Sequence, residues 1–298
     1  MQNENRSKSS ASLAQYSLAA QKASAEIIRA YSTSFGWSSN LLGRKARIHI
    51  RNIYALVRIA DEIVDGAAAE ALGGALGVDP HYLLDQLERE TYRAMDCGFS
   101  SNVVVHSFAQ TARQVGIQLD IVRPFFNSMR MDLTKRIYDR RSFETYVYGS
   151  AEVVGLMCLR AFIYDRNKSE NELQQLVTGA RALGSAFQKI NFLRDLGADF
   201  EKLGRSYFPL VNVQSFSDSQ RDELIVDIEN DLKISSESLT LLPFGSRRAV
   251  SAAQMFFAAL SKKISQTPAS KLVAKRVRIN AYAKFWILLK ACLGITPK

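Results

Sequence analysis

The sequence predicts an all-α protein whose helices form a bundle around a central cavity. Apolar residues recur at three- and four-residue steps, the spacing that places them on one face of a helix. An alternation of apolar and polar residues between hairpin turns, the pattern of strands, is absent. In helical bundles, ligands usually bind between the helices. The predicted helices cover residues 19–31, 47–64, 83–95, 143–162, 173–196, 222–234, 248–264 and 273–291.

The segments outside these helices predict a single domain with a polar start. Residues 1–12 are polar and of low complexity, so we expect them to be disordered. Glycine and proline mark two loops, at 73–80 and 204–209. No linker divides the rest of the chain, although its 298 residues would allow two domains. The prediction is therefore one helical domain over residues 13–298.

Cysteine and histidine usage argues against a zinc site. The chain has three residues of each type, and none shows metal-ligand spacing. Cysteines without a pairing pattern suit a reducing compartment. The N-terminus lacks the apolar core of a signal peptide, and no apolar run reaches the roughly 18 residues of a membrane-spanning helix. The expected location is the cytoplasm, with peripheral attachment to the inner face of the cell membrane if the chain binds lipid.

The positive charge is concentrated at the C-terminal end. The formal net charge is +10, and no acidic residue follows Glu237. Such a segment indicates an anionic partner (a diphosphate, a membrane surface or nucleic acid) or forms a solvated basic face. Residues 284–290 place aromatic and aliphatic side chains beside lysines, and such a segment can lie in a membrane interface. Nucleic acid is not expected as a partner, because no binding motif is present.

Four pairs of aspartates are spaced four residues apart, so each pair shares one face of a helix. The pairs in polar surroundings, which are predicted to be solvated, are Asp218/Asp222 and Asp227/Asp231. The pairs on otherwise apolar helices are Asp61/Asp65 and Asp195/Asp199. Carboxylates in this second setting can hold magnesium, a hard cation that takes oxygen ligands and accompanies phosphate.

Each pair on an apolar helix ends a ridge of polar residues. The first ridge consists of Arg47, Tyr54, Arg58, Asp61 and Asp65. The second consists of Gln188, Asn191, Asp195 and Asp199. Buried polar ridges need partners, and two acidic ridges cannot neutralise each other. Cations and diphosphate oxygens between them would satisfy both, and the neighbouring Arg58 and Arg194 could grip phosphate with a bidentate fork.

Five blocks of the sequence form an ordered series. In chain order they are residues 31–35, 58–65, 146–155, 188–200 and 204–209. The second and fourth carry the aspartate pairs, and the fifth reads Gly-Arg-Ser-Tyr-Phe-Pro. Together these blocks resemble the squalene and phytoene synthase family. Three positions depart from the residues that are usual in this family. Glu62 stands in place of an aspartate, Ala198 in place of an acidic residue and Phe257 in place of a tyrosine.

The resemblance implies the isoprenoid-synthase helical fold and the head-to-head joining of two prenyl diphosphates through a cyclopropyl intermediate. It implies two or three magnesium ions, which manganese could replace, held by Asp61, Asp65, Asn191, Asp195 and Asp199. The resemblance and the two polar ridges together imply the following catalytic residues: Tyr54, Arg58, Asp61, Asp65, Tyr146, Gln188, Asn191, Arg194, Asp195 and Asp199. The expected substrate-binding residues are Tyr31, Ser32, Ser34, Phe35, Arg58, Ser150, Ala151, Val154, Gly155, Gln188, Asn191, Arg194, Arg205 and Tyr207.

Within the family, the block at 146–159 most resembles bacterial carotenoid enzymes, which implies phytoene synthase acting on two geranylgeranyl diphosphates. The alternative is squalene or dehydrosqualene synthase acting on farnesyl diphosphate. NADPH, which the squalene reaction needs, is not expected, and no dinucleotide fingerprint is present. An inactive helical scaffold at a membrane is the alternative from another class. The small residues expected to leave room for a prenyl chain are Gly149, Ser150, Ala151 and Gly155.

Overall fold

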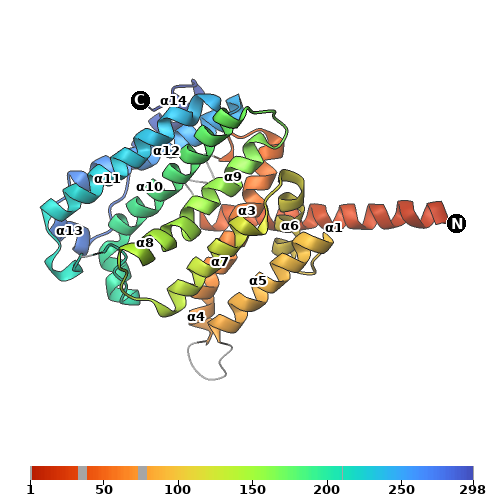
Figure 1. The fold of residues 1–298 in the computed structure, drawn as a ribbon, viewed down its shortest axis with the longest axis horizontal. Helices are drawn as coiled ribbons and strands as arrows, with labels where there is room; N and C mark the ends of the chain where they lie inside the picture. Colours follow the sequence, from red (N-terminus) through yellow and green to blue (C-terminus); the bar gives the residue numbers. More distant parts are fainter. Residues whose placement is uncertain (1, 33–38, 73–78, 210, 298) are drawn as a thin grey trace.

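The middle of the structure consists of long helices that pack side by side, α3, α9, α10 and α12 (Figure 1). The structure is a computed structural model that describes residues 2–32, 39–72, 79–209 and 211–297. Its first helices are α1 (Gln2–Tyr31), α3 (Arg44–Val64), α4 (Ala67–Leu72), α5 (Pro80–Cys97), α6 (Val103–Val115) and α7 (Leu119–Thr134). They are followed by α8 (Arg140–Val147), the π-helical turn η1 (Tyr148–Glu152), α9 (Val153–Ile163) and α10 (Glu170–Leu203). The chain continues through η2 (Val213–Ser215), α11 (Asp218–Ser238), η3 (Leu239–Leu241), α12 (Phe244–Ser265), α13 (Ala269–Ala274) and α14 (Ala281–Cys292).

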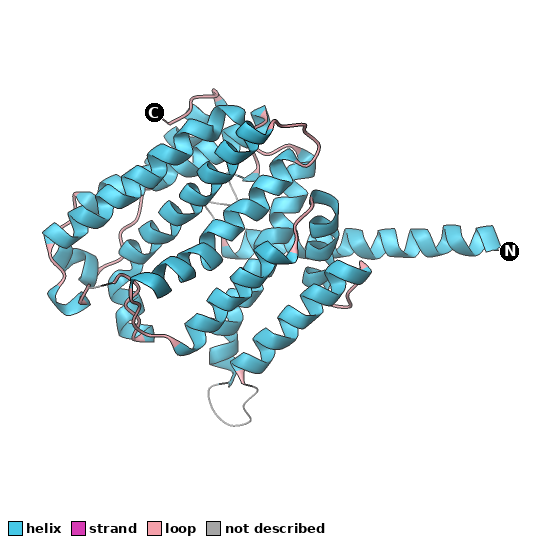
Figure 2. Cartoon of the chain, viewed as in Figure 1, coloured by secondary structure: helices cyan, strands magenta, loops and turns pink. Residues whose placement is uncertain are grey.

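The predicted all-α class is confirmed. Figure 2 shows helices and loops throughout the described residues, where the one bridge between extended residues pairs Ile137 with Ser206. Side-chain caps fix where several helices begin. Asp79 caps α5 at Pro80, and Ser169 forms a capping box with Glu172 at the start of α10. These caps satisfy backbone N–H groups that have no partner inside the helix.

Three helices, the short α4 and the longer α6 and α7, lie outside the predicted set. α6 begins after Asn102, whose side chain accepts from two backbone N–H groups, and ends at Gly116, whose φ is +75°. Its buried apolar residues recur at helical spacing: Val104, Val105, Phe108, Ala109, Ala112 and Val115. α7 contains Pro124, a residue that argues against a helix interior. The buried apolar residues of α7 also share one face, at Ile121, Val122, Phe125, Phe126 and Met129, so apolar residues at helical spacing are present in both of these longer helices.

The segment 273–291 was predicted as one helix and is not. α13 ends at Ala274, Lys275 is extended with φ −153° and ψ 132°, and α14 begins only at Ala281. α13 packs on α10 at Gly197, where any side chain would overlap the carbonyl of Val273. This docking fixes the direction of α13, and the exposed basic residues after it form a connection.

Residues 2–12, for which disorder is expected from the sequence, belong to α1 in the structure. α1 starts at Gln2, and its N-terminal part projects beyond the rest of the molecule (Figure 1). Its C-terminal half is packed through Ala20, Ser24 and Ile28, which are buried. Adding residues to an existing helix costs much less than starting one, so the polar stretch extends the packed half.

The helical stretch Arg140–Ile163 packs between α7 and α10, although its first turns are largely exposed. By length and composition this stretch could also span a membrane. No segment long and apolar enough to do so was expected from the sequence. The contact of this stretch with α10 depends on small residues. A Cβ on Gly155 would lie 2.5 Å from the carbonyl oxygen of Ala180, and one on Gly184 would lie 2.5 Å from that of Ala151. The two helices therefore run antiparallel at close range.

Candidate active site

A cavity of about 340 Å³ lies between α3, α9, α10, η3 and α12. Its wall is mainly aliphatic, with a few polar groups. Predicted residues from both polar ridges and from the 146–155 block contribute to it. They are Tyr54, Ser150, Ala151, Val154, Gly155, Gln188 and Asn191. The predicted central cavity is therefore present, and it brings these residues together.

The cavity has two unlike ends. At one end it is lined by Tyr54, Gln188 and Asn191, which belong to the ridges that continue to the aspartates. The other end is apolar and is lined by Leu159, Phe162, Leu176, Leu239, Leu242 and Val250. Along α10 the wall extends from Leu176 to Asn191. Since a helix rises about 1.5 Å per residue, that stretch is about 22 Å long.

The first aspartate pair lies at the C-terminal end of α3. Arg58 Nη1 donates a hydrogen bond of 2.5 Å to Asp61 Oδ2. The guanidinium of Arg58 also lies 5.1 Å from the ring centre of Tyr31, at the end of α1. Burial lowers the pKa of Arg58, but Asp61 and Tyr54 outweigh it and raise that pKa above its usual value. Arg58 is therefore held charged beside the mouth of the cavity.

Arg205, from the loop after α10, binds the other aspartate of this pair. Its guanidinium donates to Asp65 Oδ1 at 2.6 Å and to Oδ2 at 2.7 Å, and the side chain is only 2% exposed. It also donates to the backbone carbonyl of Asp132 at 2.5 Å and to the hydroxyl of Tyr207 at 3.2 Å. The predicted Asp65, Arg205 and Tyr207 thus meet at the end of the bundle, held by one buried guanidinium.

Asp132, near the end of α7, is a residue of this network that the sequence analysis missed. It is 2% exposed, and Tyr146 donates a hydrogen bond of 2.9 Å to its Oδ2. Burial raises the pKa of Asp132 to about 8, against the opposing effect of Arg205. The available signal was a carboxylate between the apolar Met131 and Leu133. Because α7 itself was not predicted, that signal had no helical context.

The second aspartate pair lies on α10 and is also held by arginines. Arg194 Nη2 lies 2.5 Å from Asp195 Oδ2. Arg276, from the connection between α13 and α14, places its Nε 2.6 Å from Asp195 Oδ1. Only the basic character of the C-terminal segment hinted at Arg276. One positive charge of that segment thus lies at the carboxylate site rather than on a separate basic face.

Asp61 and Asp199 lie in partly buried positions close to other carboxylates, which repel them. Burial raises the pKa of Asp61, and the negative charges of Asp65 and Glu62 raise it further against Arg58. Burial likewise raises the pKa of Asp199 to about 7, and Asp195 and Asp65 add to this. A divalent cation would relieve both the repulsion and the lost hydration.

The donor set fits magnesium that is shared with a ligand. Within the described parts of the chain, no three carboxylate, histidine or cysteine side chains converge closely enough to hold a metal ion by themselves. Each helix instead offers two carboxylates, and α10 adds the amide oxygen of Asn191. Magnesium commonly takes one or two carboxylates and completes its shell with water and phosphate oxygens. The ridges supply protein ligands of that kind.

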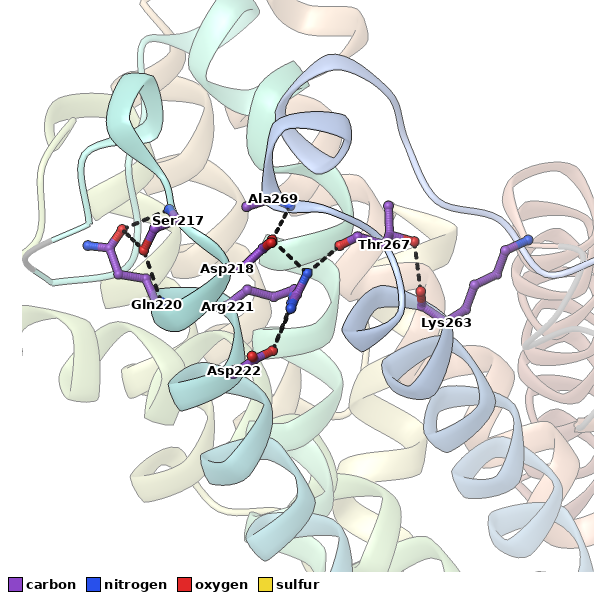
Figure 3. Close-up of polar contacts among 8 residues, drawn as sticks. All are labelled: Ser217, Asp218, Gln220, Arg221, Asp222, Lys263, Thr267 and Ala269. Atoms are coloured by element: carbon purple, nitrogen blue, oxygen red, sulfur yellow. Dashed lines mark hydrogen bonds and ion pairs between the residues drawn. The ribbon is translucent and has the colours of Figure 1, made fainter.

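The aspartate pair at the start of α11 is a structural anchor. Figure 3 shows Asp218 and Asp222 on either side of Arg221, each 2.8 Å from its guanidinium. Asp218 accepts a hydrogen bond of 2.7 Å from the N–H of Ala269, and Arg221 donates one of 2.7 Å to the carbonyl of Thr267. This group ties the start of α11 to the start of α13. Both aspartates are largely exposed, as predicted.

The pair Asp227/Asp231 was predicted to be solvated, and this is wrong for Asp231. Lys189 of α10 lies 2.6 Å from Asp227 and 2.8 Å from Asp231. Asp231 also accepts a hydrogen bond of 2.7 Å from Ser185 and is mostly buried. The close packing of α11 on α10 covers this carboxylate, so it acts as a partner for Lys189.

Several predicted residues have other positions than expected. Tyr146 does not line the cavity but packs in an aromatic cluster with Tyr138, Phe192 and Tyr207. Gly149 does not leave room for a prenyl chain, because any side chain there would overlap α7 at Pro124. Ser32 directly follows α1. Two predicted substrate-binding residues, Ser34 and Phe35, lie outside the described residues.

The structure shows the surroundings of the three positions that depart from the family pattern. Phe257 of α12 stacks on Phe187 with ring centres 3.8 Å apart, and Phe187 lines the cavity. Ala198 is exposed on α10. The carboxylate of Glu62 accepts a hydrogen bond of 2.9 Å from the N–H of Ala67 and so caps α4.

Comparisons with known proteins give a consistent assignment. Residues 28–283 match the family model of squalene/phytoene synthase. The chain is 32% identical to phytoene synthase 3, chloroplastic, of Zea mays over 205 residues, which make up 67% of this chain and 45% of that protein. It is 25% identical to 4,4'-diapophytoene synthase of Staphylococcus haemolyticus over 213 residues, 69% of this chain and 68% of that protein. The match thus spans less than half of the plant protein's length.

Solved structures share the fold. The crystal structure of a dehydrosqualene synthase in complex with ligand superposes with a TM-score of 0.75 at 21% identity, covering 94% of this chain and 98% of that chain. Squalene synthase HpnC from Alicyclobacillus acidocaldarius gives a TM-score of 0.69 at 17% identity, covering 87% and 96%. These likenesses show the isoprenoid-synthase helical fold, and the family model covers most of the chain. The chain therefore belongs to the squalene/phytoene synthase family.

Proposed function

We propose that this protein is a magnesium-dependent phytoene synthase that joins two geranylgeranyl diphosphates head to head. The C–O bond of the first diphosphate breaks to leave an allylic cation, and the double bond of the second substrate attacks it. Loss of a proton closes the cyclopropane ring, and the resulting cyclopropyl diphosphate ionises in turn, rearranges and loses a second proton. The products are a forty-carbon hydrocarbon and two diphosphates.

The length of the cavity is the observation that carries this choice of substrate. An extended prenyl chain advances about 5 Å per five-carbon unit, because each of the four bonds along it is about 1.5 Å long. A geranylgeranyl chain is therefore about 20 Å long and a farnesyl chain about 15 Å. The wall from Asn191 to Leu176, about 22 Å along α10, is long enough for the longer chain, which supports geranylgeranyl diphosphate as the substrate.

The residues at the polar end suit the release of diphosphate. Magnesium bound by Asp61, Asp65, Asn191, Asp195 and Asp199 would stabilise the departing negative charge. Arg58 is kept charged at the mouth of the cavity and can bind a phosphate oxygen. Arg194 and Arg276 on Asp195, and Arg205 on Asp65, give each carboxylate pair a cationic neighbour that would also attract the anionic substrate.

The apolar part of the cavity suits the cationic intermediates. Its aliphatic wall excludes water, which would otherwise quench an allylic cation. Tyr54 lies at the junction of the polar and apolar parts and offers an aromatic ring and a phenol oxygen to a cation there. Relatives that are named phytoene synthases support the same substrate choice.

Product analysis tests this proposal. The protein is incubated with geranylgeranyl or farnesyl diphosphate, each with and without NADPH, and with magnesium or EDTA. We expect a forty-carbon hydrocarbon from geranylgeranyl diphosphate, no dependence on NADPH, and no product in EDTA. A thirty-carbon hydrocarbon as the only product would assign farnesyl diphosphate instead, and a failure to release diphosphate from either substrate would favour an inactive scaffold.

A further inference from the structure

The surface beside the apolar end of the cavity carries a row of exposed apolar side chains. Trp286 and Leu289 of α14 and Leu293 just after it follow helical spacing and are 43%, 37% and 72% exposed. Ile295 continues the row. Large apolar residues at this spacing form one continuous stripe rather than scattered single exposures.

The start of α12 joins this stripe. Phe244 is 64% exposed, and the guanidinium of Arg248 lies 5.4 Å from the centre of its ring. Arg248 Nε also donates a hydrogen bond of 3.2 Å to the carbonyl of Ala291 in the last turn of α14. Figure 1 shows the end of α14 beside α12 at the upper edge of the molecule. Phe244 and the α14 stripe therefore belong to one surface.

Basic residues border this surface. Lys290 lies within the stripe and is exposed. Gly245 lies against Gly43, which precedes the exposed Arg44 and Lys45 at the start of α3. Neither α3 nor α12 has an acidic residue in its first turn, and no acidic residue follows Glu237. We call Phe244, Trp286, Leu289, Leu293 and Ile295, with Arg44, Lys45, Arg248 and Lys290, the C-terminal surface.

The C-terminal surface lies next to the cavity in the fold. Leu242 lines the apolar end and precedes Phe244 by two residues, and Ala249 and Val250 line it from the next turn of α12. The same short stretch of chain thus faces the cavity on one side and carries the exposed Phe244 on the other. The carboxylate pairs lie at the other end of α3 and α10.

We propose that the C-terminal surface rests on an anionic lipid bilayer, with the apolar end of the cavity beside the lipid. Apolar side chains bordered by lysine and arginine match the layered chemistry of acyl chains below anionic headgroups. A second copy of this chain fits less well, because a two-fold contact through this surface would place its basic residues against one another. The hydrocarbon that leaves the cavity would then enter lipid without crossing water.

Vesicle flotation of the full-length protein tests this proposal without requiring turnover. Neutral phosphatidylcholine vesicles are compared with vesicles that contain phosphatidylglycerol, at low and high salt. We expect at least tenfold stronger binding to the anionic vesicles at low salt, and a decrease in high salt. The double variant Leu289→Ser/Leu293→Ser should lower binding at least tenfold. The matched control Val226→Ser, at an exposed apolar position on α11, should bind like the wild type.

A second variant tests whether Leu289→Ser/Leu293→Ser lowers vesicle binding only because it disturbs the packing of the helix. The charge reversals Arg44→Glu and Lys290→Glu leave every apolar side chain in place, and together they should abolish the preference for anionic vesicles. Equal binding to neutral and anionic vesicles, or wild-type binding by both variants, would overturn the proposal. A wild-type dimer in solution that Leu289→Ser/Leu293→Ser converts to a monomer would assign the surface to a second copy and would also overturn it. Activity in detergent micelles, measured on the same samples, tests the proposed function separately.

Discussion

Arg205 holds Asp65 with two hydrogen bonds of 2.6 and 2.7 Å although 140 positions separate the two residues in the chain. The contact joins the end of α3 to the loop after α10, and it places a buried guanidinium behind one carboxylate of the proposed magnesium site. Its fork fits a carboxylate in a way that a lysine ammonium does not.

We therefore predict that Arg205→Lys lowers kcat/KM by about tenfold or more and raises the magnesium concentration needed for half-maximal activity, because it leaves Asp65 incompletely positioned. Magnesium titrations of diphosphate release measure both effects. Arg140→Lys is the control, since Arg140 pairs with Glu144 on the surface. An unchanged magnesium requirement in Arg205→Lys would argue against this positioning role.

Replacing any one of Asp61, Asp65, Asp195 and Asp199 by alanine should remove most activity while the protein stays folded. Losing a magnesium ligand weakens the stabilisation of the departing diphosphate and should cost on the order of 100-fold in kcat. Activity and circular dichroism are measured together. Asp222→Ala, which removes an exposed partner of Arg221, should retain nearly full activity. Comparable losses in Asp222→Ala would refute the assignment of the site.

The apolar end of the cavity should set the length of the substrate. Val250→Phe fills that end, so we predict that turnover of geranylgeranyl diphosphate falls by about tenfold while farnesyl diphosphate is affected much less. Competition between the two substrates, with product masses as the readout, measures the ratio. Val226→Phe, outside the cavity, should leave the ratio unchanged. A parallel fall for both substrates would show that this end does not sense length.

Gly155 should be required for the packing of α9 on α10. Gly155→Ala places a methyl group 2.5 Å from the Ala180 carbonyl oxygen, so the helices must separate. Overpacking of this kind costs about 1–3 kcal/mol, and the melting temperature should fall by several degrees. Gly43→Ala is the matched control, because no atom lies within 4 Å of its Cβ position. Equal melting temperatures of the two variants would contradict this role.

The stability of the metal-free protein should decrease as the pH rises toward 9. The pKa of Asp132 is raised from 3.8 to about 8, so the folded state binds a proton that the unfolded chain has lost. Its contribution to stability is complete below the unfolded pKa and disappears as the pH rises through about 8. Thermal unfolding in EDTA between pH 6 and 9 measures the slope, and Asp132→Asn should reduce it. Asp139→Asn, at a carboxyl whose pKa is lowered by a backbone hydrogen bond, should not.

The parts of the proposed site that could be predicted from the sequence lie on two polar ridges with helical spacing. The ridge from Tyr54 to Asp65 and the ridge from Gln188 to Asn191 follow helical spacing, so their positions on the cavity and at its mouth could be predicted. Asp132 and Arg276 were not predicted. Asp132 lies on α7, which was missed although its buried residues share one face. Arg276 reaches the site from an irregular connection, where contacts depend on tertiary packing.

Glycine roles were the second source of error. A small residue can leave space for a ligand or allow a neighbouring helix to approach, and the sequence alone does not distinguish the two. Gly149 serves the approach of α7, whereas Gly155 lies on the cavity wall and also allows α10 to approach. Of the aspartates outside the proposed site, Asp218, Asp222 and Asp227 are exposed as their polar neighbours predict, whereas the packing of α11 on α10 covers Asp231.

The opposite character of the two cavity ends has a kinetic consequence. The two products of the proposed reaction differ as much as the ends do, since one is a multiply charged anion and the other a hydrocarbon. In the proposed reaction the anion would leave past Arg58 and the aspartates, and the hydrocarbon would leave past Leu239 and Leu242, which line the apolar end of the cavity. Because the two routes share no residues, added diphosphate should slow the release of diphosphate only, and accumulated hydrocarbon should slow a different step. The two products should then be able to inhibit the enzyme at the same time, so the factors by which each slows turnover should multiply.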